Sequence, residues 1–148
     1  MTVLGLGHDV VHLPSFADQL ADPASGFEAG TFTDAERSSV APAGPRRIES
    51  LGARFAAKEA FVKAWSAARF GRPPALDAVD LREIEVVADG WGRPAIRLAG
   101  RVAEAVDDLA AGGCIQVHLS LSHDGPVASA MVLLDRDDAA DLHANVRQ

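Results

Sequence analysis

Asp9 is the first residue whose surroundings suggest chemistry, because it stands in an otherwise apolar, β-forming run over residues 3–11. A carboxylate in such a run is costly to bury unless it is paired or binds a metal. The alternative is a carboxylate that points outward from an edge strand. Because Asp is rarely buried in proteins, residue type alone favours this alternative.

A second group of charges, Arg54, Lys58, Glu59 and Lys63, lies in a segment with strong helical periodicity. Glu59 and Lys63 are four residues apart and therefore share one face of a helix. A solvated ion pair is the common reason for this spacing, and such pairs stabilise proteins little. The segment is nevertheless dense in alanine and aromatic residues, so most of the helix should be buried and its charges should line a cleft.

A third candidate is the run Ser122, His123 and Asp124, which the pattern places in a turn between the last two strands. A histidine beside a carboxylate can bind phosphate or move protons. A turn in which the side chain of Asp and a following Gly satisfy the backbone is the more frequent case.

Considered together, these groups favour metal-assisted phosphoryl transfer. Asp9 and Glu59, from two different elements, can hold Mg2+, which typically takes one or two carboxylates, several waters and substrate phosphates. Arg54, Lys63 and His123 would then neutralise a polyphosphate substrate, so that positioning and charge neutralisation supply most of the catalysis.

The elements that must position these residues can be read from periodicity and turn residues. The sequence predicts a buried strand over 3–13, short helices starting at Pro14 and Thr33, and one long helix over 46–69. It then predicts a hairpin of strands over 80–88 and 95–98, a helix over 101–111, and a second hairpin over 115–122 and 127–134. This order predicts an α+β fold in which an antiparallel sheet packs on one long central helix.

Length and composition bound the remaining possibilities. The 148 residues fit a single domain over 1–148, with a core over about 3–134 and a polar C-terminal tail over 135–148 that is expected to be weakly helical or disordered. A net charge of −7 argues against nucleic-acid binding, and no apolar run is long enough to span a membrane. One cysteine excludes an internal disulfide, and the start lacks the basic residues of a signal peptide, so we expect a cytoplasmic protein.

The chain resembles the holo-acyl-carrier-protein synthases, the small trimeric class of 4′-phosphopantetheinyl transferases. The segment over 54–64 is the most specific part of the resemblance, and details over 63–66 and 91–94 resemble an actinobacterial branch. The matching segments, in the family's order, are Gly5–Val11, Phe32–Glu36, Ala53–Ala64, Gly92–Pro94 and Val117–His123.

The resemblance implies the 4′-phosphopantetheinyl transferase fold and a Mg2+-dependent reaction. The phosphopantetheine arm of coenzyme A would pass to a serine of an apo acyl carrier protein, or of a carrier domain in a fatty acid synthase, and 3′,5′-ADP would leave. It implies that Asp9 and Glu59 hold the metal, and that Lys63 contacts the pyrophosphate. The implied binding positions for the nucleotide and its phosphates are Arg54, Arg93, Pro94, Ser122 and His123.

The resemblance also implies a homotrimer in fatty acid biosynthesis, with each site formed between neighbouring subunits. It leaves the general base open: a water relayed through Glu59 is one option, and His123 oriented by Asp124 is the other. Many relatives carry arginines on the first helix that grip the carrier protein, and none stands over 14–20 here. Either the carrier docks on other surfaces, for which Arg46, Arg47 and Arg69 are candidates, or the partner is different, and our hypothesis for that partner is a carrier domain within a large fatty acid synthase.

Two other functions compete with transfer. The pairs His8-Asp9 and His123-Asp124 are also found in metal-dependent phosphohydrolases of the His-Asp type, but those domains are all-helical. A non-enzymatic trimeric module could bind coenzyme A or a carrier without transferring anything, although mere binding would not require both metal carboxylates.

Overall fold

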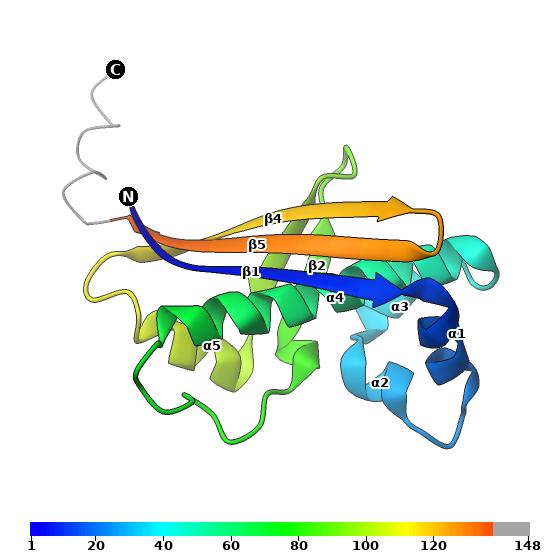
Figure 1. Ribbon diagram of the computed structural model, residues 1–148, viewed down its shortest axis with the longest axis horizontal. Coiled ribbons are helices and arrows are strands. Elements are labelled where there is room, and N and C mark those ends of the chain that lie inside the picture. Colours follow the sequence, from blue (N-terminus) through cyan, green and yellow to red (C-terminus); the bar gives the residue numbers. More distant parts are fainter. Residues whose placement is uncertain (138–148) are drawn as a thin grey trace.

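A computed structural model of the chain describes residues 1–137, so the predicted tail over 135–148 lies outside the described residues from 138 onward. A three-stranded antiparallel sheet lies along one long helix, α4, with shorter helices at both ends of that helix (Figure 1). The predicted α+β fold is therefore confirmed. The described helices are α1 Leu13–Ala21, α2 Phe27–Thr31, α3 Asp34–Ser38, α4 Pro45–Ala68 and α5 Gly100–Asp107, with a single 3₁₀ turn, η1, at Leu81–Glu83.

The main sheet has the order β1-β5-β4, in which β1 spans Thr2–His12, β4 spans Cys114–Asp124 and β5 spans Val127–Asp137. Because β5 pairs with both neighbours, β1 and β4 are the two edges of this sheet. A separate hairpin is formed by β2, Ile84–Ala88, and β3, Pro94–Leu98.

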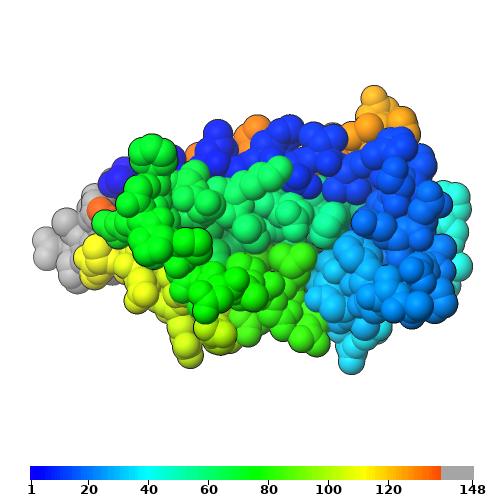
Figure 2. All heavy atoms as spheres, turned by 60° about the horizontal axis from the view of Figure 1, so that its bottom comes forward, coloured from blue at the N-terminus to red at the C-terminus, as the bar shows by residue number. Residues whose placement is uncertain are grey.

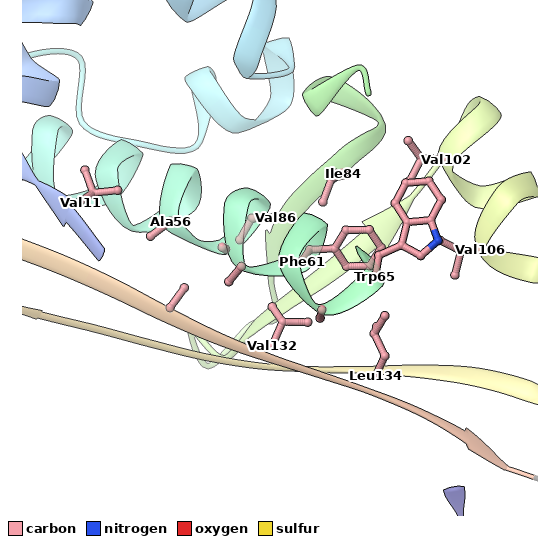
Figure 3. Packing of buried hydrophobic residues seen from close by; sticks show 14 of the residues in the cluster. Val11, Ala56, Phe61, Trp65, Ile84, Val86, Val102, Val106, Val132 and Leu134 are labelled. Carbon is pink, nitrogen blue, oxygen red and sulfur yellow. The ribbon is translucent and has the colours of Figure 1, made fainter. Parts of the chain in front are cut away.

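Helix α4 begins at Pro45, a residue suited to a first turn because the missing N–H would have no helical partner there. Its alanine-rich centre packs against β1 and β5, so that small side chains bring backbones close together. Near its C-terminal end, Phe61 and Trp65 fill the space between the sheet and the surrounding elements (Figure 3). The core residues around them are Ile84, Val102, Val106, Val132 and Leu134.

Two glycines on β1 set the distance between the sheet and α4. An ideal Cβ at Gly7 would lie 1.9 Å from the carbonyl oxygen of Ala60, and one at Gly5 would lie 2.1 Å from that of Ala64. No side chain fits at either position, so β1 lies directly on the helix backbone. This close approach places the residues that follow Gly7 on β1 beside the middle of α4.

Several predicted boundaries and burials are wrong. The strand β1 is not buried on both faces, since Leu6 and Val10 are 54% and 55% exposed on the face turned away from α4. Residues 81–83 form η1 rather than strand, and α5 ends at Asp107 instead of 111. Strands β4 and β5 are longer than predicted, because their ladder continues past Ser122 to Asp124 and past 134 to Asp137. No helix among residues 1–137 has the length and apolar character needed to cross a membrane.

Candidate functional site

Asp9 lies on the β1 side that faces α4, two residues after Gly7. Its Oδ1 accepts a hydrogen bond of 2.7 Å from Nζ of Lys63, which also donates to the carbonyl oxygen of His8 at 3.1 Å. The Asp9 side chain is 15% exposed and that of Lys63 is 52% exposed, so the ion pair sits at the edge of the buried layer. The outward-facing alternative for Asp9 is therefore wrong.

Glu59 lies one helical turn before Lys63 and shares a hollow of about 290 Å³ with Asp9. Burial raises the pKa of the Glu59 carboxyl, the negative charge of Asp9 raises it further, and Lys63 opposes both effects. The hollow is closed on one side by residues of α1 and by Phe55. Asp9, Glu59 and Lys63 are called the carboxylate cluster below.

The carboxylate cluster fits a hard divalent cation. It holds two carboxylates close enough to repel one another and only one ammonium, which leaves negative charge in a half-buried hollow. Among residues 1–137 no group of three or more His, Cys, Asp or Glu side chains could hold a metal on its own. Two carboxylates suit Mg2+, since that ion keeps waters and takes its other ligands from substrate phosphates.

Two residues that sequence reasoning missed also line this hollow. His12 ends β1 and Ser15 lies in the first turn of α1, and a hydrogen bond of 2.8 Å joins Nδ1 of His12 and Oγ of Ser15. The available signal in the sequence was that two polar residues, three positions apart, lie where the predicted strand ends and the predicted helix starts. It was weak, because polar residues are common at such junctions.

Arg54 and Pro94, predicted to contact the nucleotide, line a different hollow of about 400 Å³ between α4, the β2–β3 hairpin and β4. We call it the hairpin cavity. The Arg54 guanidinium donates to the carbonyl oxygen of Ser50 at 3.1 Å and to Oγ of Ser39 at 3.2 Å. Burial lowers the pKa of Arg54, and the charge of Glu36 opposes that shift.

Arg93 and Ser122 are next in the sequence to residues that line the hairpin cavity, Pro94 and Leu121. Arg93 is exposed in the β2–β3 turn, where it pairs with Asp89 at 2.6 Å and lies 5.0 Å from the ring centre of Trp91. Ser122, His123 and Asp124 are exposed residues of β4, so the prediction that His123 and Asp124 lie in a turn is wrong.

The predicted site residues therefore fall into two sets within one chain. The carboxylate cluster lies at the β1 edge of the main sheet, whereas His123 and Asp124 lie on the β4 edge, with β5 between them. The structure brings Asp9, Glu59 and Lys63 together, and it brings Arg54 and Pro94 together. It does not join the two sets in a single chain.

Lys58 does not line a cleft, contrary to the expectation for the charges of α4. Its fully buried ammonium donates to Oε2 of Glu36 at 2.9 Å and to the carbonyl oxygens of Leu81 at 2.8 Å and Ile84 at 2.7 Å. Burial lowers the pKa of Lys58, and the hydrogen bond that Lys58 donates to Glu36 opposes that shift. Lys58 thus connects α4 to α3 and to the start of the hairpin.

Two of the three arginines considered for carrier docking are engaged within the chain. Arg47 pairs with Glu28 and donates to the carbonyl oxygen of Ala41 at 3.2 Å. Arg69 donates twice to the carbonyl oxygen of Pro73, at 3.2 and 3.1 Å. Arg46 is exposed.

Comparison with known proteins gives consistent matches over nearly the whole chain. Residues 5–123 match the family model described as ACPS, the 4′-phosphopantetheinyl transferase superfamily. The holo-[acyl-carrier-protein] synthases of Mycobacterium ulcerans and Mycobacterium tuberculosis are 42% identical over 135 residues, which cover 91% of this chain and 98% of each relative.

Solved structures agree with these matches. An ACPS–CoA complex from Chronobacterium ammoniagenes superposes with a TM-score of 0.82 at 44% identity, covering 90% of this chain and 98% of that chain. The acyl carrier protein synthase of Mycobacterium tuberculosis gives a TM-score of 0.71 at 38% identity, with coverages of 91% and 99%.

Proposed function

Because the chain belongs to the 4′-phosphopantetheinyl transferase superfamily and to its holo-acyl-carrier-protein synthases, we propose that it transfers the phosphopantetheine arm of coenzyme A to an apo acyl carrier protein. The acceptor is a serine hydroxyl of the carrier protein or carrier domain, and the pathway is fatty acid biosynthesis in the cytoplasm. The observation that carries the proposal is that Asp9 and Glu59 line one hollow, at whose edge Asp9 pairs with Lys63.

Asp9 and Glu59 would hold Mg2+ between them. When bound, the metal neutralises the pyrophosphate of coenzyme A and makes its β-phosphorus easier to attack. The assignment is supported by the shared hollow of Asp9 and Glu59, and by the pKa of Glu59, which is raised first by burial and then by the charge of Asp9, with Lys63 opposing both.

The serine oxygen forms a bond to the β-phosphorus, the bond from that phosphorus to the bridging oxygen breaks, and 3′,5′-ADP leaves with the electron pair. Lys63 keeps a positive charge next to the reacting phosphates, and its half-exposed side chain is free to leave Asp9 for a phosphate oxygen. The serine proton must move to a base. Glu59, acting through a water, is favoured over His123 because it lies inside the carboxylate cluster.

The nucleotide end of coenzyme A is assigned to the hairpin cavity and to the β4 edge, through Arg54, Arg93, Pro94, Ser122 and His123. Since these residues do not meet the carboxylate cluster within one chain, we propose a homotrimer in which one subunit supplies the carboxylate cluster and its neighbour supplies the hairpin cavity. Within the part of the chain that the structure describes, one face of the main sheet leaves Leu6, Val10 and Met131 about half exposed, and this apolar surface supports such an assembly.

Mass spectrometry of the acceptor tests the transfer directly. Apo carrier protein mixed with the enzyme, coenzyme A and Mg2+ should gain the mass of a phosphopantetheine group, and chelation of the metal should stop the reaction. Asp9→Ala and Glu59→Ala should each lower the rate by about 100-fold, as expected when a group that stabilises transition-state charge is removed. Asp18→Ala, which removes an exposed acid from α1, is the matched control and should leave the rate unchanged.

A protein that binds coenzyme A by calorimetry but leaves the carrier mass unchanged would contradict the proposal and favour a binding module. A comparison of free carrier protein with an excised carrier domain of a fatty acid synthase would identify the preferred acceptor.

A further inference from the structure

Trp91 is a large aromatic side chain to which the proposed reaction gives no part. It is 83% exposed, whereas Trp65, the other tryptophan of the chain, is 4% exposed in the core. Tryptophan is highly buried on average in proteins, because its large indole gains much by leaving water. An indole that stays in water is therefore a candidate for contact with a ligand or a partner.

The turn that carries Trp91, residues 89–93, is held together by Asp89. Its Oδ1 accepts hydrogen bonds from the amides of Trp91 and Arg93, both at 2.9 Å, and its carbonyl oxygen accepts one from the amide of Gly92 at 3.0 Å. Gly92 has a φ of 80°, a conformation that glycine adopts without strain. The backbone that presents the indole is thus fixed in advance, which lowers the entropy lost when a ligand binds to it.

Arg93 packs on one face of the indole. Its guanidinium carbon lies 5.0 Å from the ring centre, a cation–π contact, and its Nε donates to Oδ2 of Asp89 at 2.6 Å. Trp91 remains largely exposed with Arg93 in place, so the other face of the ring is open to a second flat group. Nucleobases stack on tryptophan in this way.

The turn lies at the rim of the hairpin cavity, since Gly92 and Pro94 both line that cavity. Figure 1 shows the β2–β3 hairpin reaching past β4, with the turn at its end. Arg54 is the one charged residue among the described residues that line the cavity, and most of the other walls are apolar, such as Leu119. A cavity of about 400 Å³ with apolar walls and few polar groups suits a heteroaromatic ring.

On the basis of the proposed transfer, we propose that Trp91 is the surface on which the adenine ring of coenzyme A stacks. Adenine is the only aromatic group of that substrate, and it is flat and large enough to cover the open face of an indole. The ribose separates adenine from the reacting phosphates. Trp91 therefore contributes to the affinity for the substrate and takes no part in the bond changes.

Two substitutions at Trp91 test this role. Trp91→Ala removes the indole, and Trp91→Phe keeps a smaller aromatic ring at the same place. Phe70→Ala is the matched control, because Phe70 is 96% exposed and does not line the hairpin cavity. Phe70 belongs to the segment that follows α4, which lies in green beside β1 in Figure 2.

The first measurement is calorimetry with 3′,5′-ADP and with 4′-phosphopantetheine, which carry the adenine and the arm separately. Stacking of a base on an aromatic side chain is worth about tenfold in affinity or more, so Trp91→Ala should weaken the binding of 3′,5′-ADP by that factor. Trp91→Phe should regain most of this loss, and Phe70→Ala should bind like the wild type. The affinity for 4′-phosphopantetheine should be the same in all four proteins, which also reports that the variants are folded.

The transfer assay and fluorescence give two further readouts. Trp91→Ala should raise KM for coenzyme A about tenfold and leave kcat unchanged, as expected when binding is lost equally in the ground state and the transition state. Acrylamide reaches the exposed Trp91 and not the buried Trp65. In the wild type, 3′,5′-ADP should lower acrylamide quenching to the level of Trp91→Phe, and 4′-phosphopantetheine should leave it unchanged.

The possible results separate the role of Trp91 from the function on which it depends. A wild-type protein that neither modifies the carrier nor binds 3′,5′-ADP overturns the proposed function. Transfer from coenzyme A with the same KM in the wild type and in Trp91→Ala overturns the role of Trp91 alone. The same follows if acrylamide quenching is already low in the free enzyme, or if apo carrier protein without nucleotide lowers it, because a neighbouring subunit or the carrier then covers the indole.

Discussion

Glu59 is the single residue on which the proposed chemistry depends most. Glu59→Gln keeps the size of the side chain and removes its charge, so we expect transfer to fall by about 100-fold and the Mg2+ concentration for half-maximal rate to rise. Rates measured over a magnesium titration would check both effects. Glu104→Gln, on the exposed side of α5, should change neither.

The raised pKa of Glu59 also gives a pH dependence whose sign can be worked out. Because the folded protein favours the protonated carboxyl, the ionised form costs stability at neutral pH, and that cost disappears as the pH falls through the raised pKa. In the absence of metal, Glu59→Gln should therefore raise the Tm at neutral pH and lose this advantage in acid. A variant that melts below the wild type at both pH values would contradict the assignment of Glu59 to a partly buried position beside Asp9.

Residue types and spacing were enough to find Glu59 and Lys63, because four residues on a helix define a shared face. They could not separate Lys63 from Lys58, which is the same residue type on the same helix. Lys58 is buried because α3 and η1, distant in the sequence, cover its face of α4. Only the tertiary contacts carry that information.

Among the elements, β1 and α4 matter most, because their close approach positions the carboxylate cluster. Gly7→Ala would place a Cβ 1.9 Å from a helix carbonyl oxygen, and the backbone on both sides must move apart. We expect a loss of about 1–3 kcal/mol in unfolding free energy from overpacking. Transfer should fall by about 100-fold as Asp9 moves away from Lys63, since displacements near 1 Å have effects of that size.

Urea unfolding and carrier mass analysis of Gly7→Ala measure these two losses. Gly30→Ala is the control, because a Cβ there meets no atom within 4 Å and alanine favours the helix α2 that contains it. Equal stability and rate for the wild type and Gly7→Ala would mean that the spacing between β1 and α4 does not position the site.

The packing of α4 against the β2–β3 hairpin depends on hydrogen bonds of Lys58 and Glu36. Glu36 also accepts hydrogen bonds from the amide of Val86 at 3.0 Å and from the amide of Thr33 at 3.0 Å, so one buried pair connects three elements. Lys58→Met should cost about 3–5 kcal/mol in unfolding free energy, because it leaves a buried carboxylate without its cation.

The double variant Lys58→Met, Glu36→Gln should lose less than the sum of the two single losses, as measured by urea unfolding of all four proteins. Arg101→Met, which removes an exposed cation from α5, should stay within about 0.5 kcal/mol of the wild type. Additive losses would show that the ion pair is not the interaction that matters.

Most elements could be predicted from the sequence, because turn residues and periodicity are local signals. The capping box at Thr33 and Glu36 is an example, since both of its predicted hydrogen bonds are present. Strand lengths could not be predicted where pairing extends them. His123 and Asp124 were predicted as turn residues, and they are in β4 because they pair with Ala128 and Val127 of β5. The helix α2 has too few residues to give a periodic signal.

At the scale of the whole molecule, the main sheet has one face against α4, and no element of residues 1–137 covers the other face (Figure 1). The sequence predicted β1 as buried because its residues are apolar on both faces. Half-exposed Leu6, Val10 and Met131 show that one chain does not satisfy that pattern. A trimer would cover the second apolar face of β1. It would also explain why the predicted site residues fall into two sets.

Mixing two inactive variants tests both halves of this arrangement at once. Asp9→Asn disables the carboxylate cluster and leaves the hairpin cavity intact. Arg54→Ala disables the hairpin cavity and leaves the carboxylate cluster intact, so a trimer of either variant alone should be inactive. After the two are dissociated and reassembled together, a site is complete wherever an Arg54→Ala subunit meets the hairpin cavity of an Asp9→Asn subunit. Random assembly of a cyclic trimer gives about a quarter of the wild-type rate. Light scattering should give three times the chain mass in every sample, and a mixture that stays inactive at that mass would place the whole site within one chain.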